Sequence, residues 1–168
     1  MKLVKLLAAA LTLSLASSSW AAAAPDAVQV KAAQDLMASM QAEKMMRTTA
    51  SNSRYANEAQ RKAVFDKLDK VAPAQIYQRL AAPVARLVST ETATEMTRFY
   101  NSSYGQKVLK QKYNGGPGML GAQLPTPTAA EKKELKRPQY VKASKELAAA
   151  EPAIEHESFV LLSAIMKK

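Results

Sequence analysis

Few side chains in this sequence could carry out chemistry. The chain has one histidine, His156, and no cysteine, which excludes a disulfide framework, a thiolate metal site and a cysteine nucleophile. His156 stands between Glu155 and Glu157, but successive residues on a helix point about 100° apart, so these three side chains do not converge on one ion. A zinc site also lacks a second histidine. We therefore predict no metal site and no cofactor.

Methionines are the next candidates. Met37 and Met40 lie one turn apart, and Met45 and Met46 follow. Thioethers bind Cu(I), so such a group could hold copper. However, Met37 and Met40 belong to an apolar helical stripe, where methionine is an ordinary core residue. We therefore expect them to pack in the core.

Carboxylate pairs and a glycine-rich segment complete the candidates for chemistry. Asp66 and Asp69, like Glu131 and Glu134, alternate with lysines. This is typical of solvated helix faces, which are far commoner than acid–base dyads. Glycines in residues 115–118 have no strand before them and no Gly-Lys-Ser/Thr element, so they do not form a phosphate loop. The sequence thus contains no recognisable enzyme signature.

The chain opens with the pattern of a secretory signal peptide. Lys2 and Lys5 give a positively charged start, and an apolar run at residues 6–16 precedes residues 17–21, which are small except for Trp20. A retained membrane anchor is the alternative, but this run is shorter than the roughly 18 apolar residues of a membrane span. We predict a signal peptide over residues 1–21 and no stable membrane span.

Cleavage is expected after Ala21, where the spacing of small residues suits the peptidase. Cleavage after Ala23 is the alternative, and a cut after Ala24 is less favourable because Pro25 would follow it. Loss of two lysines and no acidic residue would change the net charge from +10 to +8 in the mature chain, residues 22–168. Because no cysteine is present for lipid attachment, we predict a soluble protein of the bacterial periplasm.

The positive charge of the chain gathers in one stretch. Residues 96–150 contain ten basic and three acidic residues, net +7. Such a surface attracts an envelope protein or an anionic cell-envelope polymer, and export argues against nucleic acid as a partner. The alternative is a lysine-rich face that only solubilises the protein. The candidate anion-binding residues are Arg98, Lys110, Lys112, Lys132, Lys133, Lys136 and Arg137.

Apolar spacing predicts helices through the first half of the mature chain. Residues 26–53 are predicted to form a single helix, because they carry apolar side chains at intervals of three and four. Residues 57–70 show the same spacing and are predicted to form a second helix. A third helix begins near Pro73, because proline suits a first turn. Asp26 and Asn57 are the expected N-caps of the first two.

Three more helices flank a loop that is rich in glycine and proline. Ser89 or Thr90 would cap the first, and Ser102 the second. The loop, residues 114–127, is about 14 residues long, so we expect it to be functional or mobile. Thr128 has a glutamate three residues later, which is the spacing of a capping box at the start of the third helix.

The C-terminal region is predicted to end in a separate helix. Pro138 interrupts or divides the preceding helix, while Glu151 and Pro152 supply a typical helix start. The inward stripe of the last helix would contain Ile154, Phe159, Leu162, Ile165 and Met166. No segment alternates apolar and polar residues as a strand does. The sequence therefore predicts an all-α fold, a single-domain bundle of six to eight short to medium helices.

A short motif stands between two of these helices. Residues 99–107 are Phe-Tyr-Asn-Ser-Ser-Tyr-Gly-Gln-Lys. Phe99 and Tyr100 would close one helix into the core, and Ser102 would cap the next. Gly105 then falls in a first turn, where glycine costs stability, so we expect close approach by a neighbouring helix. We interpret the motif as a structural helix corner rather than a binding site.

This motif resembles the hallmark of an exported bacterial family known as domain of unknown function 2059. The family pattern is Phe-Tyr, any residue, Ser, usually Pro, any residue, Gly, and often Gln-Lys. It matches this chain from Phe99 to Lys107, except that Ser103 stands where proline is usual. The resemblance covers about residues 30–112. It implies an all-helical exported protein and assigns no catalytic residue.

Together these features lead to three hypotheses about function. The first is a binding or scaffolding module whose basic half, residues 98–145, contacts an anionic envelope component or a protein. The alternative is an uncharacterised, hydrolase-like enzyme with a pocket at residues 114–127, which convergent carboxylates, Tyr113 and a perturbed lysine would favour. The third is a structural protein that dimerises through apolar faces left over from the core.

Overall fold

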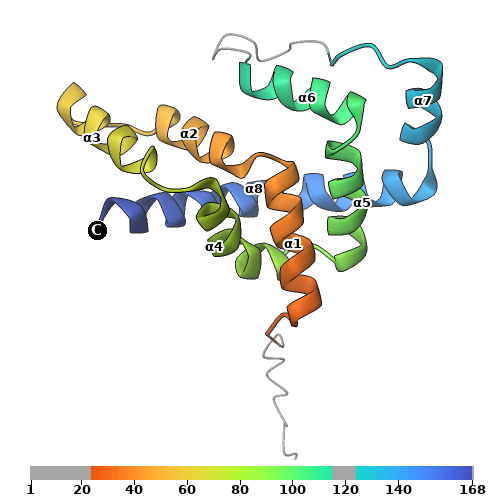
Figure 1. Ribbon diagram of the computed structural model, residues 1–168, viewed down its shortest axis with the longest axis horizontal. Coiled ribbons are helices and arrows are strands. Elements are labelled where there is room, and N and C mark those ends of the chain that lie inside the picture. The colour runs from red at the N-terminus through yellow and green to blue at the C-terminus, as the bar shows by residue number, and fades with distance from the viewer. Residues whose placement is uncertain (1–23, 115–123, 168) are drawn as a thin grey trace, which may run out of the picture.

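The computed structural model describes residues 24–114 and 124–167. The predicted signal peptide and most of the predicted 114–127 loop therefore lie outside the described residues. Within them there are eight helices and no strand, so the predicted all-α bundle is confirmed (Figure 1). The helices are α1 (Ala27–Ser39), α2 (Ala42–Asn52), α3 (Glu58–Leu68), α4 (Pro73–Ala85), α5 (Thr90–Tyr100), α6 (Ser103–Asn114), α7 (Ala129–Leu135) and α8 (Pro138–Met166).

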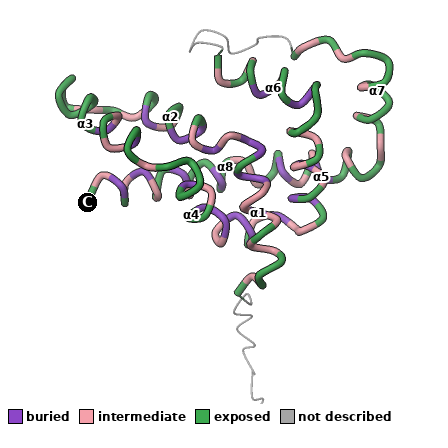
Figure 2. Tube along the Cα trace, in the orientation of Figure 1, coloured by how far each residue is buried: buried purple, intermediate pink, exposed green. Residues whose placement is uncertain are grey.

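The longest helix, α8, runs along the length of the bundle (Figure 1). It contacts α7 and α5 near its start and α2, α4 and α3 farther on. At its far end the Lys67 ammonium of α3 donates to the Met166 carbonyl oxygen at 2.8 Å. The helix α1 packs chiefly against α4 and α5. The inner faces of these helices form one buried core, which is purple in Figure 2.

Local capping explains where several helices begin. In each case a side-chain oxygen accepts a hydrogen bond from the backbone N–H three residues on, which satisfies a donor that has no partner inside the helix. These caps are Asp26, Asn57, Ser89 and Thr128. Asp26, Asn57 and Thr128 are confirmed as predicted, and of the two alternatives Ser89 and Thr90 the structure shows Ser89 as the cap.

The single helix predicted over residues 26–53 is wrong, because α1 and α2 are separated at Gln41. This residue lies in the left-handed region at φ 56°. In an unbroken helix Met37 and Met46, nine residues apart, would point to opposite sides, since each residue turns about 100°. The break lets both side chains face the core, where each is 0% exposed.

The separate helix predicted to start at Glu151 and Pro152 is also wrong, because α8 continues through both residues. A proline inside a helix leaves the carbonyl four residues earlier, here that of Ala148, without its helical donor. Both Pro152 and Ala148 lie on the exposed side of α8. Water can bond the freed carbonyl there, so the helix tolerates the proline.

The inward stripe of this region is confirmed in most positions and wrong at Phe159. Ile154, Leu162 and Ile165 are buried, while Phe159 is 50% exposed. Its neighbour Ser158 is fully buried instead, and its hydroxyl donates to the Ile154 carbonyl oxygen at 3.0 Å. The reason is helical spacing: a residue four after Ile154 shares its face, whereas one five after it is turned well away.

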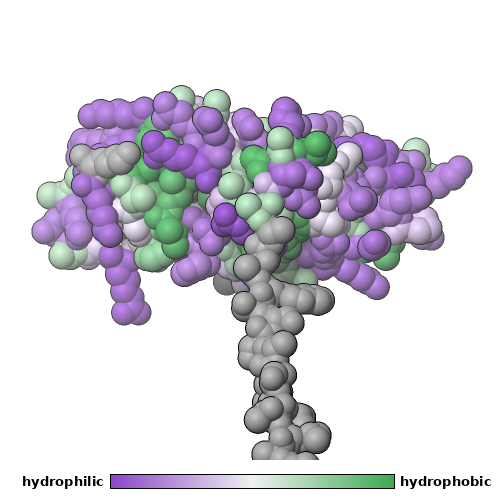
Figure 3. Space-filling view, turned by 90° about the horizontal axis from the view of Figure 1, so that it is seen from below, coloured by the Kyte–Doolittle hydropathy of each residue, from purple (hydrophilic) through white to green (hydrophobic). Residues whose placement is uncertain are grey.

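The surface of the described part is mostly polar. Figure 3 shows apolar side chains as separate patches among hydrophilic ones. The exposed large apolar residues come from distant parts of the chain: Val28, Leu124, Val141, Phe159 and Val160. No helix within residues 24–114 and 124–167 combines the length and apolar character needed to cross a bilayer.

Candidate functional site

The motif at residues 99–107 forms the turn from α5 to α6. Ser102 joins the two helices, because its Oγ donates to the Phe99 carbonyl oxygen at 2.6 Å and accepts from the Gly105 N–H at 3.1 Å. The second bond is the one expected of an N-cap. The first closes the end of α5, so one hydroxyl fixes both sides of the turn.

Gly105 lies directly against the backbone at the end of α5. A Cβ atom at this position would lie 2.8 Å from the Phe99 carbonyl carbon and 2.8 Å from Tyr100 Cα. Real Cβ atoms do not approach backbone so closely, because packed interiors leave no such overlap. The close approach that the sequence leads us to expect is present, and space rather than a left-handed backbone requires the glycine.

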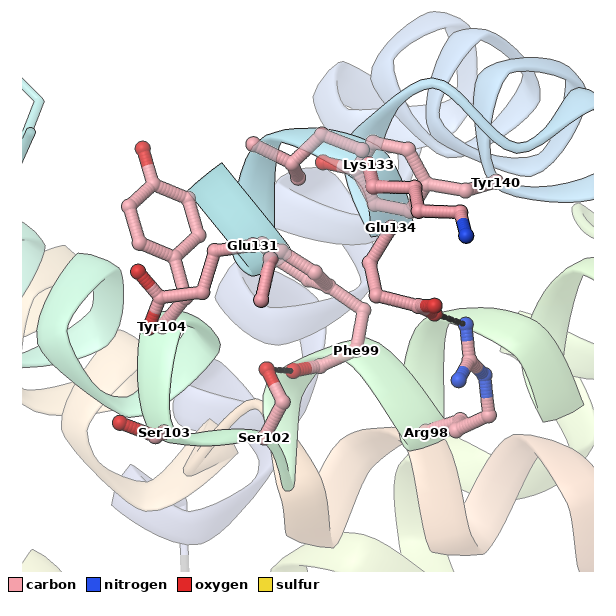
Figure 4. Close-up of a pocket in the computed structure, with 11 residues that line it drawn as sticks. Arg98, Phe99, Ser102, Ser103, Tyr104, Glu131, Lys133, Glu134 and Tyr140 are labelled. Carbon is pink, nitrogen blue, oxygen red and sulfur yellow. Dashed lines mark hydrogen bonds and ion pairs between the residues drawn. The ribbon is translucent and has the colours of Figure 1, made fainter. Parts of the chain in front are cut away.

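A cleft of about 380 Å³ opens beside this corner, between α5, α6, α7 and the start of α8 (Figure 4). Its walls are largely apolar and aromatic, formed by Phe99, Tyr104, Leu135 and Tyr140. The centroid of the Phe99 ring lies 4.9 Å from that of Tyr140 and 6.3 Å from that of Tyr104. The Tyr104 hydroxyl donates to the Pro125 carbonyl oxygen at 2.9 Å, which ties the segment before α7 to α6.

A second cavity of about 300 Å³ adjoins the first. The same four side chains, Phe99, Tyr104, Leu135 and Tyr140, line both cavities. Farther in, the second cavity is bordered by core residues, among them Met96, Leu147 and Ile154. The corner thus holds two neighbouring apolar spaces that share one wall.

The helix α7 directs its charges to two sides. Its glutamates face the corner. Glu131 accepts from the Lys107 ammonium at 3.3 Å. Glu134 accepts from the Arg98 guanidinium at 2.9 Å, as Figure 4 shows. Its lysines are exposed, and no described carboxylate lies within ion-pair distance of them. These lysines are Lys132, Lys133 and, just after the helix, Lys136.

A half-buried glutamate of α5 anchors the arginines of this region. The side chain of Glu95 is 14% exposed and accepts hydrogen bonds from both Arg98 and Arg137. Burial by itself would raise the pKa of Glu95, but the hydrogen bonds from Arg137 and Arg98 outweigh it and hold the pKa below its ordinary value. Glu95 is therefore an ionised structural group.

The seven candidate anion-binding residues divide into two groups. Arg98, Lys112 and Arg137 are paired with glutamates of the bundle. The others are exposed and have no ion-pair partner among the described residues: Lys110, Lys132, Lys133 and Lys136. Of these, Lys133 lines the cleft. The basic surface inferred from the sequence is therefore smaller than its charge count indicates.

The motif residues also divide between structure and cleft. Phe99 and Ser102 line the cleft, and Tyr100 lines the second cavity. Gly105 and Lys107 line neither, since Gly105 supports the turn and Lys107 holds Glu131. The corner is thus both a structural turn and one wall of a cleft.

Sequence reasoning missed Leu135 and Tyr140 as members of this site. Leu135 is the one large apolar residue of α7, and α7 has no buried residue. A lone apolar side chain in an otherwise charged short helix indicates a contact outside that helix, so the signal was present. Tyr140 gives no such signal, because only the packing of α8 against α5 brings it to Phe99.

The remaining candidates for chemistry make ordinary structural contacts. Asp66 pairs with Lys62 and Asp69 with Arg47. His156 is exposed on α8, and within the described part of the chain no three histidine or acidic side chains are grouped to hold a metal ion. The methionines expected in the core, Met37 and Met40, are buried there.

The alternative enzyme site at residues 114–127 falls mainly on residues 115–123, outside the described residues. Of the described part, Leu124 lines the second cavity. The carboxylate nearest in the chain, Glu131, accepts from the Thr128 N–H at 2.8 Å. This hydrogen bond lowers the pKa of Glu131, so that carboxylate is a structural anion and is poorly suited to act as an acid.

Comparisons with known proteins add no relative to these observations. No family model, no curated protein and no solved structure matches the chain. The resemblance of residues 99–107 to the domain of unknown function 2059 family stays a prediction from the motif.

Proposed function

We propose that this protein is an exported binding module of the bacterial envelope, whose outer α7 face recognises an anionic envelope component or an acidic protein. We define this α7 face as Lys132, Lys133 and Lys136. The observation that supports the proposal best is the division of charges on α7: its glutamates are engaged with Lys107 and Arg98, while its lysines are exposed. Ammonium groups without a neutralising neighbour attract anions.

The proposed periplasmic location rests on the predicted signal peptide at residues 1–21. An exported protein meets the phosphate and carboxylate groups of the cell envelope, and these are the anions that a lysine face attracts. The contacts would lie at the surface, where each ion pair contributes only about 0.2–1 kcal/mol. Several lysines acting together are therefore needed, and salt should weaken the association.

The proposal is tested by reversing the charge of the α7 face. The variant Lys132→Glu/Lys133→Glu/Lys136→Glu should lose low-salt association of the mature protein, residues 22–168, with an envelope extract. A matched control, Lys44→Glu/Lys70→Glu/Lys167→Glu, changes three other exposed lysines and gives the same net charge. It should retain binding. Association that survives charge reversal at α7, or that persists unchanged at high salt, would contradict the proposal.

A further inference from the structure

We infer that the corner cleft is an acyl-chain site, and that its ligand is an anionic amphiphile with the chain in the cleft and the anionic head at Lys133. This inference rests on the proposed function, since it takes the preference of the α7 face for anions as given. It adds the chemical class of the ligand and the place where the apolar part binds.

The size and lining of the cleft suit a hydrocarbon chain. Its volume of about 380 Å³ lies within the roughly 300–1,000 Å³ of small-molecule sites. Phe99, Leu135 and the rings of Tyr104 and Tyr140 provide the apolar walls. The second cavity, about 300 Å³, shares these four walls, so a longer chain gains more apolar space when one of the side chains turns aside.

The polar groups around the cleft argue against a peptide or a sugar as the ligand. Ser102 is bonded to Phe99 and Gly105, and the Tyr104 hydroxyl is bonded to Pro125. The carboxylates of Glu131 and Glu134 are engaged as well. A ligand rich in polar groups would be buried without enough partners, which is costly. A hydrocarbon chain needs no such partners, so it fits a cleft in which Ser102, Tyr104, Glu131 and Glu134 already bond within the protein.

The position of the free charge determines which end of the ligand lies outward. Lys133 lines the cleft and has no carboxylate partner among residues 24–114 and 124–167. Figure 4 shows its ammonium on the same side of the cleft as the Arg98 guanidinium, which Glu134 already holds. An anionic head at this side meets Lys133, with Lys132 and Lys136 close by in the chain. The charge complementarity therefore orients an amphiphile with its head at the α7 face.

The experiment measures binding to the mature protein by calorimetry, with every amphiphile below its micelle concentration. The probes are dodecyl phosphate, octyl phosphate, dodecyl maltoside and inorganic phosphate. Dodecyl phosphate should bind, and octyl phosphate should bind at least tenfold more weakly, since each methylene buried changes affinity about fourfold. Inorganic phosphate alone should bind more than tenfold more weakly than dodecyl phosphate.

Variants of α7 locate the chain and the head. Ala130→Trp fills the cleft from α7 and should weaken dodecyl phosphate binding at least tenfold, whereas Ala129→Trp, on the same helix but outside the cleft lining, should not. Ser103→Trp fills the cleft from α6 and serves as a second variant. Lys133→Glu should weaken dodecyl phosphate several-fold more than Lys132→Glu does. It should leave dodecyl maltoside unchanged.

The outcomes separate this inference from the proposed function. If dodecyl phosphate binds with no dependence on chain length and both tryptophan variants bind normally, the acyl-chain site is wrong, although the α7 face still binds anions. If dodecyl maltoside binds as tightly as dodecyl phosphate and Lys133→Glu changes nothing, the cleft is apolar only and an anionic head at Lys133 is wrong. The proposed function fails separately, when charge reversal of the whole α7 face leaves low-salt association intact. If a hexaglutamate peptide competes with dodecyl phosphate, and Ala130→Trp blocks binding of that peptide, the ligand of the cleft is an acidic peptide and not an amphiphile.

Discussion

The turn at Ser102 and Gly105 places the first turn of α6 against the last residues of α5. One hydroxyl bonds to both helices, and the missing side chain of the glycine lets the two backbones meet. Because Phe99 leads into this turn and also forms a wall of the cleft, any shift of the turn moves that wall. The corner therefore couples local backbone geometry to the shape of the cleft.

Gly105→Ala should destabilise the protein by about 1–3 kcal/mol, because its Cβ atom has no room beside the Phe99 carbonyl. The sign of this change is informative, because replacing glycine by alanine inside a helix ordinarily stabilises a protein by about 0.5–1 kcal/mol. Urea denaturation monitored by circular dichroism measures the change. Ser103→Ala, at an exposed position of the same turn, serves as the control. A Gly105→Ala variant more stable than the parent would show that Gly105 does not pack closely against the Phe99 carbonyl.

Glu146 of α8 contacts the start of α5, and the contribution of this contact to stability depends on pH. Its carboxylate accepts from the Ser89 N–H at 2.6 Å and from the Thr92 hydroxyl at 2.8 Å, at the start of α5. Burial alone would raise the pKa of Glu146, but the hydrogen bonds from Ser89 and Thr92 outweigh it and hold the pKa below its ordinary value. The ionised form is therefore favoured in the folded protein.

Glu146→Gln should lower the free energy of unfolding by about 1–2 kcal/mol at pH 7. The folded pKa is depressed, so the contribution is complete above the unfolded pKa of about 4.3 and is lost as the pH falls through the folded pKa. The difference between variant and parent should therefore shrink by pH 3. Urea denaturation at the two pH values measures it. Glu155→Gln, exposed on the same helix, should show little effect; an equal deficit at pH 7 and pH 3 would refute the pH argument.

Among the helices, the starts that are marked by a cap were predictable, whereas the break at Gln41 and the continuity of α8 through Pro152 were predicted wrongly. Caps such as Asp26 and Thr128 depend on residues three apart, so short-range sequence determines them. The break at Gln41 has a sequence signal as well, because Met37 and Met46 lie half a turn out of phase. Whether Pro152 ends a helix depends on which side faces water, and only the packing of α8 determines that.

The candidate site was predictable where it is local. Phe99 and Ser102 belong to one short motif, so the turn and its cap follow from adjacent residues. The pairing of Arg137 with Glu95 joins residues 42 apart in the chain, and a charge count cannot reveal it. The sequence therefore overstated the free basic surface, and it left out Tyr140, which reaches the cleft only through tertiary packing.

Charged contacts hold much of α7 in place. It has no buried residue, and its glutamates bind Lys107 and Arg98. Glu134→Gln should therefore speed amide hydrogen exchange across residues 129–135 by about two- to fivefold, as expected for the loss of a surface ion pair. Mass spectrometry of exchanged peptides measures this.

A matched control for α7 is available in α3. Glu58 pairs with Arg61 inside a single helix at 3.5 Å, so Glu58→Gln should leave the exchange of α7 unchanged. High salt should speed exchange in the parent protein and have less effect in Glu134→Gln, because screening weakens the same contact. Equal protection of α7 in the parent and in Glu134→Gln would mean that apolar contacts hold the helix.

At the scale of the whole molecule, α8 connects the two ends of the bundle. It contacts α2, α3, α4, α5 and α7, and Ile154, which is 1% exposed, lies in the core near its middle. Ile154→Ala should cost about 2–5 kcal/mol, and unfolding should remain a single transition. Urea denaturation followed by both circular dichroism and fluorescence tests these two statements. The shift of the curves gives the loss of stability, and the two probes should give coincident curves if unfolding is a single transition. Val160→Ala, 46% exposed on the same helix, should change stability by less than about 0.5 kcal/mol; two separate transitions would show that the ends fold independently.

The methionines packed around the α1–α2 break have a consequence for oxidative damage. Met37, Met40, Met45 and Met46 are each at most 6% exposed, so an oxidant reaches their sulfur atoms mainly when the bundle opens. A methionine sulfoxide is polar and no longer fits an apolar interior. Opening of the bundle in an oxidising medium would thus expose these sulfur atoms to oxidation, and the sulfoxides formed would hinder closing. The sulfoxide content of these four residues would therefore increase with the time that the protein spends unfolded.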